Sequence, residues 1–170
     1  ATPHERAHAG IGRSFQIPQP FENLTVYENL LVGAVYGQGV RERDAVQMCG
    51  EILENTQMAK RANALAGSLS LLERKRLELA RALATKPKLL LLDEIAGGLT
   101  EGECHALIAT VKQVHASGTT IVWIEHVVHA LMAVVTRLIV LNGGHKIADG
   151  LPSEVIAQQD VRQIYLGITV

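Results

Sequence analysis

Two adjacent carboxylates, Asp93 and Glu94, follow four consecutive leucines at positions 89–92. Such a run predicts a strand buried on both faces, as in a parallel sheet covered by helices. The acids then lie at the strand end, the edge at which open α/β sheets bind ligands. One carboxylate can hold Mg²⁺, and the other can deprotonate an attacking water. The pair suits a magnesium-nucleotide site; taken alone, it equally fits a buried strand with a solvated acidic end.

Polar residues also end two other segments with the pattern of strands. Residues 120–125 are mostly apolar and lead to His126, and a short extended segment over 11–15 leads to Gln16. Because strands alternate with helices in the second half of the chain, we expect a parallel sheet. The pair Gly143-Gly144 predicts a hairpin near the end of the chain.

A helical region separates the first strand from the leucine strand. Thr25, Ser70 and Thr100 are each followed three residues later by Glu, the spacing of a capping box, and each therefore predicts a helix start. The basic residues 74–76 are expected to form a solvated helix face. Three glycines, Gly33, Gly37 and Gly39, are expected to break the first two helices apart. The predicted helices cover 4–9, 25 onward, 41–58, 70–84, 100–117, 127–135 and 152–159, and the predicted strands 11–15, 89–93, 120–125, 137–142 and 146–149.

In this order the segments resemble the nucleotide-binding subunit of an ABC transporter. The matching motifs are the Q-loop at Gln16, the signature at 69–73, Walker B at 89–94, the D-loop at 96–100 and the switch histidine at His126. The sequence looks most like the branched-chain amino acid uptake subfamily in the stretches FENLTVYENL (21–30), EH (125–126) and IADGLPSEV (147–155).

The resemblance implies an α/β fold, a partial ABC-type P-loop NTPase core in which a mostly parallel sheet is flanked by helices, with an inserted α-helical subdomain. Residues 1–20 would begin the covered core and include the Q-loop. Residues 21–84 would form the helical subdomain and end in the signature helix. Residues 85–170 would complete the core with Walker B, the D-loop and the switch histidine.

The resemblance also implies roles for single residues, with ATP and Mg²⁺ as cofactors. Asp93 would bind Mg²⁺, and Glu94 would be the base that polarises the hydrolytic water. Gln16 would hold Mg²⁺ and that water through its amide oxygen, and His126 would donate a hydrogen bond to the γ-phosphate. Ser70 and the N-terminus of the helix that it begins would contact the nucleotide bound by a facing subunit.

The implied partners are transmembrane permease subunits, a second ATPase subunit that is identical or paralogous, and indirectly a periplasmic binding protein. The subunit would lie on the cytoplasmic face of the inner membrane. The permease contact is expected around residues 16–28, with apolar anchors at Phe15, Ile17, Phe21 and Tyr27. The alternative for these side chains is that they pack the helical region onto the core.

One motif that this resemblance requires is missing. No G-x-x-x-x-G-K-[ST] occurs in the sequence, so no loop can wrap N–H groups and a lysine around the phosphates. We therefore expect the chain to be the C-terminal portion of a longer subunit that hydrolyses ATP. Alone, the 170 residues are expected to be inactive and to bind Mg-ATP very weakly, an expectation that tight binding in calorimetry would contradict.

Several residues depart from the family pattern. Leu71 and Leu72 stand where glycines are usual, and Glu73 where glutamine is usual. Leucine admits a phosphate less closely than glycine and disfavours positive φ. Ile95 replaces the proline after Walker B, and Thr100 the Asn or Asp of the D-loop. These departures put efficient hydrolysis across a sandwich dimer in doubt while leaving the expected fold intact.

Composition restricts the other functions. The formal net charge is -1, and aromatic residues make up 4%, so neither a broad basic field nor a stacking platform for nucleic acid is expected. Two cysteines without C-x-x-C spacing predict reduced structural thiols. Two alternatives to a transporter motor remain: a non-catalytic fragment that folds without gripping ATP, and a soluble ABC ATPase outside transport.

Overall fold

The computed structural model describes residues 1–165 and divides the chain into two compact units, residues 1–130 and 131 onward. The last five residues of the expected 85–170 segment lie outside the described part. The first unit is an α/β structure, as the sequence predicts. The domain boundaries at 20 and 84 stay a prediction.

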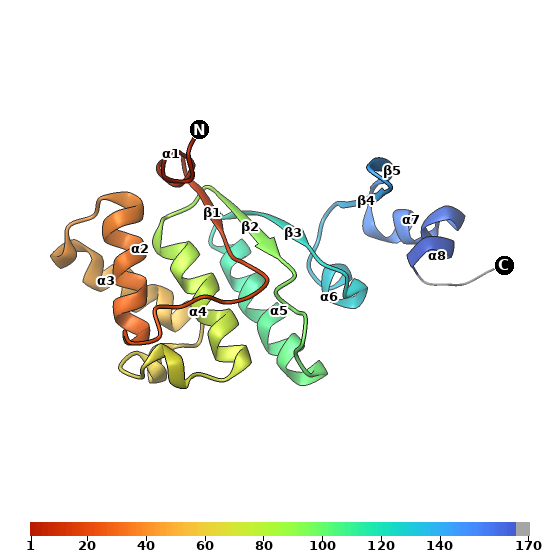
Figure 1. Cartoon of the computed structure of the whole chain (residues 1–170). Coiled ribbons are helices and arrows are strands. Elements are labelled where there is room, and N and C mark those ends of the chain that lie inside the picture. The colour runs from red at the N-terminus through yellow and green to blue at the C-terminus, as the bar shows by residue number, and fades with distance from the viewer. Residues whose placement is uncertain (166–170) are drawn as a thin grey trace. The chain divides into compact units, whose positions relative to one another are not determined.

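A three-stranded parallel sheet forms the centre of the first unit (Figure 1). It follows a short helix α1 (Pro3–His8), and its strands are β1 (Ile11–Arg13), β2 (Leu89–Asp93) and β3 (Thr120–Ile124). The leucine strand β2 lies in the middle and pairs with the other two. Since all three strands run in the same direction, their carboxyl ends share one edge of the sheet.

The two faces of this sheet differ in burial. Leu90 and Leu92 lie on one face and are buried; Figure 1 shows helices α4 (Leu71–Ala84) and α5 (Glu101–Ala116) beside the strands. On the other face Leu89 and Leu91 are only half-buried, and the β3 side chain Ile124 is 64% exposed. The expectation of a strand buried on both faces is therefore wrong for one face.

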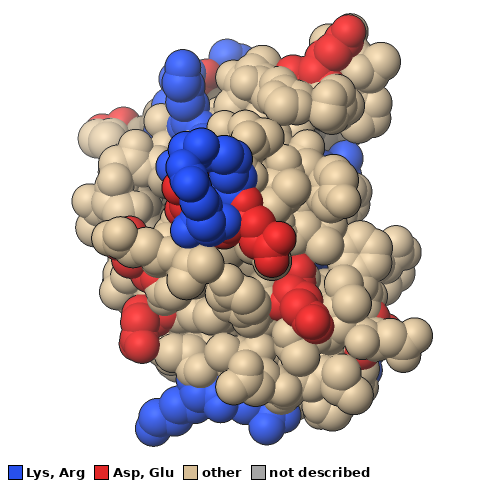
Figure 2. Space-filling view, turned by 90° about the vertical axis from the view of Figure 1, so that its left-hand side faces the viewer, with Lys and Arg blue, Asp and Glu red and all other residues tan. Residues whose placement is uncertain are grey.

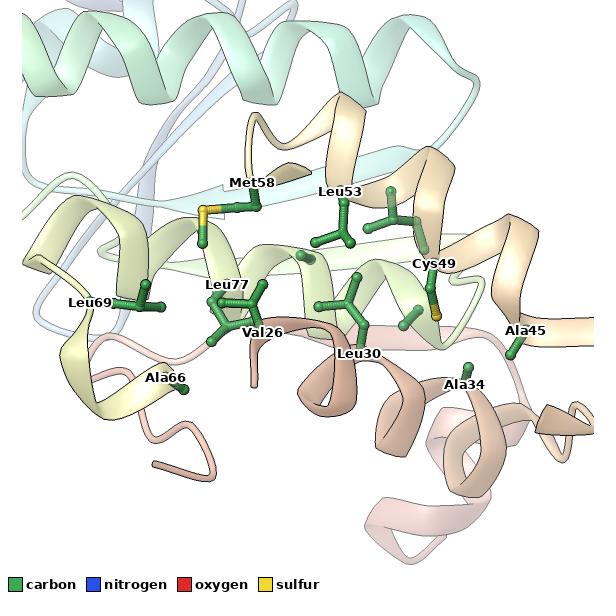
Figure 3. Packing of buried hydrophobic residues seen from close by; sticks show 13 residues of the cluster. Val26, Leu30, Ala34, Ala45, Cys49, Leu53, Met58, Ala66, Leu69 and Leu77 are labelled. Atoms are coloured by element: carbon green, nitrogen blue, oxygen red, sulfur yellow. The ribbon is translucent and has the colours of Figure 1, made fainter. Parts of the chain in front are cut away.

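Three helices between β1 and β2 form the helical region that the sequence predicts. They are α2 (Val26–Gln38), α3 (Glu42–Asn55) and α4 (Leu71–Ala84), and the 3₁₀ turns Ala59–Arg61 and Ala66–Ser68 join the last two. Their apolar faces meet in one core (Figure 3), whose largest fully buried members are Leu30, Met58, Leu77 and Val26. The apolar residues that recur at helical spacing in the sequence are thus the ones buried in this shared core.

Two of the three glycines in this region do not break a helix, contrary to expectation. Gly33 and Gly37 lie inside α2, and only Gly39 ends it, in the left-handed conformation with φ 67°. A Cβ on Gly33 would lie 2.9 Å from the carbonyl oxygen of Arg81, and one on Gly37 would lie 2.7 Å from Thr85 Cγ2. The glycines therefore allow α2 to approach α4 closely.

The predicted helix starts are confirmed in detail. Thr25, Ser70 and Thr100 each accept the N–H three residues on, and the glutamate at that position accepts the N–H of the cap. Thr100 thereby begins α5 (Glu101–Ala116). The ends were harder to predict: α3 stops three residues before the expected Met58, and α6 (Val128–Met132) is shorter than predicted.

The second unit is a small hairpin with two helices. Strands β4 (Leu138–Asn142) and β5 (His145–Gly150) pair antiparallel across Gly143 and Gly144, which both have positive φ as the predicted turn requires. Helices α7 (Pro152–Ala157) and α8 (Gln159–Tyr165) follow, where the sequence predicts one helix. The unit has its own small core, formed by Val140, Ala148, Val155 and Val161.

The face drawn in Figure 2 carries no single-sign field, because basic groups lie beside acidic ones among uncharged residues. Within the described residues, no helix is both long and apolar enough to cross a membrane. Cys49 and Cys104 are free and buried, as expected of structural thiols.

Candidate functional site

The candidate site lies at the carboxyl edge of the parallel sheet. Gln16 follows β1, Glu94 follows β2 and His126 follows β3, and each stands within three residues of its strand's end. Residues far apart in sequence are therefore brought to neighbouring positions by strand pairing alone. This edge is where open α/β sheets bind ligands.

Two of the five predicted site residues, Gln16 and His126, approach one carboxylate oxygen of a third, Glu94. The amide nitrogen of Gln16 donates to Oε2 of Glu94 at 2.5 Å, and Nδ1 of His126 lies 3.6 Å from the same oxygen. The Glu94 side chain keeps about a third of its surface exposed. A carboxylate in this position has an ordered donor on one side and remains accessible to water on another.

The neighbouring acid, Asp93, has a different partner. Its Oδ2 accepts a hydrogen bond from the guanidinium of Arg13 at 2.8 Å. The strand register places Arg13 beside Leu91, so the ion pair spans from β1 to the end of β2. The two adjacent carboxylates are thus in separate environments, one neutralised by an arginine and one facing an amide and an imidazole.

The backbone at Glu94 is strained. Its φ of 44° lies in the left-handed region, which costs a non-glycine residue roughly 1–2 kcal/mol. Its N–H donates to the carbonyl of Ile124 at 2.9 Å, and its own carbonyl accepts from the N–H of Gly97 at 3.4 Å and from Nζ of Lys75 at 3.3 Å. These contacts fix the turn that directs the Glu94 side chain.

Ser70 does not join this group. Among the described residues it has no hydrogen bond to Gln16, Glu94 or His126, and its hydroxyl is engaged in capping α4. The capping partner, Glu73, is also 2.9 Å from Nε of Arg61. The carboxylate of Glu73, which replaces the usual glutamine of the signature, is therefore bound by Arg61 and by the N–H of Ser70.

Two residues at the site were missed from the sequence. Glu125 was noted only as part of a family phrase, yet its side chain is fully buried and accepts the N–H groups of Ala96, His126 and Val127. Lys75 was assigned to a solvated face, which is wrong, because it is 4% exposed and bonds the Glu94 carbonyl. Its position four residues before Leu79, on the apolar stripe, was the available signal.

The family model described as "ABC transporter" matches residues 2–97, more than half of the chain. The chain belongs to the ABC transporter family. It is an ATPase subunit of the type that powers such transporters, and its parallel sheet with flanking helices is the fold of that subunit's ATP-binding cassette.

Related proteins come from more than one kind of transporter. The branched-chain amino acid transport ATP-binding protein BraF of Pseudomonas aeruginosa is 34% identical over 96% of this chain and 70% of its own length. The probable branched-chain amino acid transport protein LivG of Methanocaldococcus jannaschii is 33% identical over 97% and 70%. The lipopolysaccharide export protein LptB of Escherichia coli K12 is 32% identical over 96% and 68%.

Solved structures of the family match the whole fold. The ADP conformation of MJ1267, an ATP-binding cassette of an ABC transporter, superposes with a TM-score of 0.86 at 32% identity, covering 99% of this chain and 72% of that one. A nucleotide-free cassette superposes with a TM-score of 0.83 at 30% identity, covering 99% and 73%.

The departures from the family pattern are accommodated without disturbing the fold. Ile95, in place of the usual proline, is 2% exposed and joins the apolar interior. Leu71, in place of glycine, is nearly half exposed, and its Cδ2 lies 3.4 Å from where Gly98 would carry a Cβ. Leu71 of the signature thus packs against the loop that follows Walker B.

Proposed function

We propose that this chain is part of the ATP-hydrolysing motor of an importer for branched-chain or related amino acids. In this proposal Glu94 is the base that accepts a proton from the hydrolytic water. The observation that supports it most directly is the convergence of Gln16 and His126 on the Glu94 carboxylate at the sheet edge. His126 would donate to the γ-phosphate, and Ser70 would act on the nucleotide of a facing subunit.

The residues beside Glu94 fit a magnesium ion. Mg²⁺ prefers oxygen ligands, keeps several waters and is bound by one or two carboxylates together with substrate phosphates. Asp93 supplies such a carboxylate and Gln16 an amide oxygen, so we propose both as ligands. Mg²⁺ would neutralise charge on the phosphates, and Asp93 would leave its partly exposed bond to Arg13, which is worth at most about 1 kcal/mol.

The hydrogen bond from Gln16 bears directly on the proposed base. The amide nitrogen of Gln16 occupies the Glu94 oxygen that would accept the proton from water. Rotation of the glutamine toward Mg²⁺ would free that oxygen, so that binding of the metal nucleotide and release of the base occur together. Catalytic contacts of this kind commonly tighten only in the bound complex.

The permease would dock on the segment that follows the site. Phe15, Ile17 and Phe21 expose about half or more of their surface, although they are apolar. We propose them as anchors for a transmembrane permease subunit, with the ATPase on the cytoplasmic face of the membrane. A second ATPase subunit and, indirectly, a periplasmic binding protein complete the proposed assembly.

Transport direction is the main alternative within the family, because LptB is nearly as similar as BraF. The test is to produce the ATPase from its whole reading frame, assemble it with the permease encoded beside it, and reconstitute both in vesicles with the binding protein. Stimulation of ATP turnover and uptake by leucine, isoleucine or valine supports the proposal. Turnover that is indifferent to amino acids and responds to a lipid substrate would favour export.

A further inference from the structure

A lysine is buried in α4 directly beneath the turn that holds Glu94. Lys75 is 4% exposed, and its Nζ donates to the Glu94 carbonyl at 3.3 Å. Burial lowers the pKa of the Lys75 ammonium, and the nearby carboxylates of Glu125 and Glu94 oppose this effect. A buried cation is costly unless it is paired, so the two carboxylates are the reason that this lysine can be inside.

Glu125 is a buried charge on the other side of the same turn. Its Oε2 accepts the N–H of Ala96 at 3.0 Å, and its Oε1 accepts the N–H of His126 at 3.1 Å. One carboxylate therefore fixes the backbone after Glu94 and the start of the loop that carries His126. The Glu94 turn and the start of the His126 loop are therefore tied to a single buried group.

Together the two charges hold the Glu94 turn from both sides. Lys75 binds the carbonyl of Glu94, and Glu125 binds the N–H two residues later. Between them the backbone at Glu94 keeps φ at 44°, a conformation that persists only where its surroundings determine it. The Glu94 side chain leaves this turn toward Gln16 and His126.

We infer that Lys75 and Glu125, two buried charged groups that bind this turn at two points, position Glu94 for hydrolysis, which makes Lys75 of the signature helix a positioning residue of the reaction. This inference rests on the proposed role of Glu94 as the base. It also gives the signature helix a direct link to the base of its own subunit. Displacement of α4 would move the Glu94 carbonyl, and with it the carboxylate.

The test uses the ATPase produced from its whole reading frame and assembled with its permease. Lys75→Met removes the donor and the charge but keeps an unbranched side chain of similar length. We expect kcat to fall on the order of 10–100-fold, the effect of misplacing a catalytic group by about 1 Å, with the KM for ATP nearly unchanged. Lys112→Met, which alters an exposed cation on α5, is the control and should retain the parent kcat.

A second variant set separates positioning from folding. Glu125→Gln removes one of the two carboxylates that favour the Lys75 ammonium, whereas Lys75→Gln with Glu125→Gln neutralises both groups and retains an amide donor toward the Glu94 carbonyl. We expect the double variant to have a higher kcat than Glu125→Gln alone, because it no longer buries an ammonium that has lost a nearby carboxylate, so the two losses are not additive. If Lys75→Met does not fold, the comparison of the double variant with Glu125→Gln tests whether Lys75 positions Glu94.

Parent kcat and KM in Lys75→Met would overturn the inference, as would additive losses in the double variant. The role of Glu94 is judged separately by Glu94→Gln. An inactive Glu94→Gln beside a fully active Lys75→Met would reject the positioning pair and leave the proposed function standing. A fully active Glu94→Gln would reject the proposed function itself.

Discussion

Gln16 and Glu94 are 78 positions apart in the sequence, yet the amide nitrogen of one lies 2.5 Å from the carboxylate of the other. Parallel pairing of β1 with β2 brings them together, since both follow the carboxyl ends of adjacent strands. The contact joins the candidate base to the segment that leads into the exposed apolar residues. It therefore links the proposed chemistry with the proposed permease surface.

Replacing Gln16 should impair turnover more than nucleotide binding. Gln16→Leu removes both the donor to Glu94 and the amide oxygen proposed for Mg²⁺ and water. We predict a fall in kcat on the order of 10–100-fold with a small change in the KM for ATP, measured in the assembled transporter. Gln159→Leu, at the exposed start of α8, should behave as the parent. Equal activity in both variants would remove Gln16 from the mechanism.

Arg13 should compete with Mg²⁺ for Asp93. The guanidinium lies 2.8 Å from the Asp93 carboxylate, and a metal ion must replace it there. We predict that Arg13→Gln lowers the Mg²⁺ concentration for half-maximal ATPase activity, while Asp93→Asn raises it. The shift for Arg13→Gln should be a few-fold, because a partly exposed ion pair contributes at most about 1 kcal/mol. Identical magnesium titrations for parent and Arg13→Gln would speak against Asp93 as a ligand.

Phe21 should contribute to permease assembly and little to folding. Its ring is 46% exposed and lies under the guanidinium of Arg81, 5.0 Å from the ring centroid. Loss of an aromatic anchor typically costs about 2 kcal/mol or more of binding, roughly thirtyfold. Phe21→Ala should therefore weaken co-purification with the permease while its free energy of unfolding stays within about 1 kcal/mol of the parent.

The matched control for Phe21 is Tyr36→Ala, which truncates an exposed aromatic side chain of α2 outside residues 16–28. It should leave assembly unchanged. Normal co-purification of Phe21→Ala, or its unfolding, would show that Phe21 is a packing residue and that the docking surface lies elsewhere.

Glu78 predicts a pH dependence of stability. Burial raises the pKa of this carboxyl, outweighing the opposing effects of Arg81 and the Gln19 backbone. The folded protein then binds the proton more tightly than the unfolded chain, so this contribution to stability is present below the ordinary pKa of 4.5 and is lost as pH rises through the folded value.

The measurement compares the parent with Glu78→Gln by denaturant unfolding from pH 4.5 upward. The free energy of unfolding of the parent minus that of the variant should decrease as pH rises. An increase with pH would mean that the bond to Arg81 outweighs burial and lowers the folded pKa instead.

Local signals allowed much of the fold to be predicted. The three capping boxes, the leucine strand and the Gly143-Gly144 hairpin each depend on residues within a few positions of one another, and each is confirmed. Gly33 and Gly37 show where such reasoning fails. Their role is set by the approach of α4, which lies far along the sequence, and local propensity cannot reveal a distant neighbour.

The sequence predicted some residues of the candidate site, but not the contacts that they make. Strand ends and family motifs located Gln16, Glu94 and His126, whereas the pairing of Asp93 with Arg13 depends on strand register. Lys75 was misassigned because a charge within a basic run is usually solvated. Only the positions of two carboxylates on other elements explain its burial.

The proposed mechanism depends most on Glu94 as the base. The direct measurement is of steady-state ATP turnover and ATP binding by Glu94→Gln. The ATPase is produced from its whole reading frame and assembled with its permease. Glu101→Gln, which changes an exposed acid on α5, is the control. We predict that Glu94→Gln binds ATP as the parent does and loses turnover by about 10²–10⁴-fold, the contribution of a general base. Unchanged turnover in Glu94→Gln would contradict the mechanism.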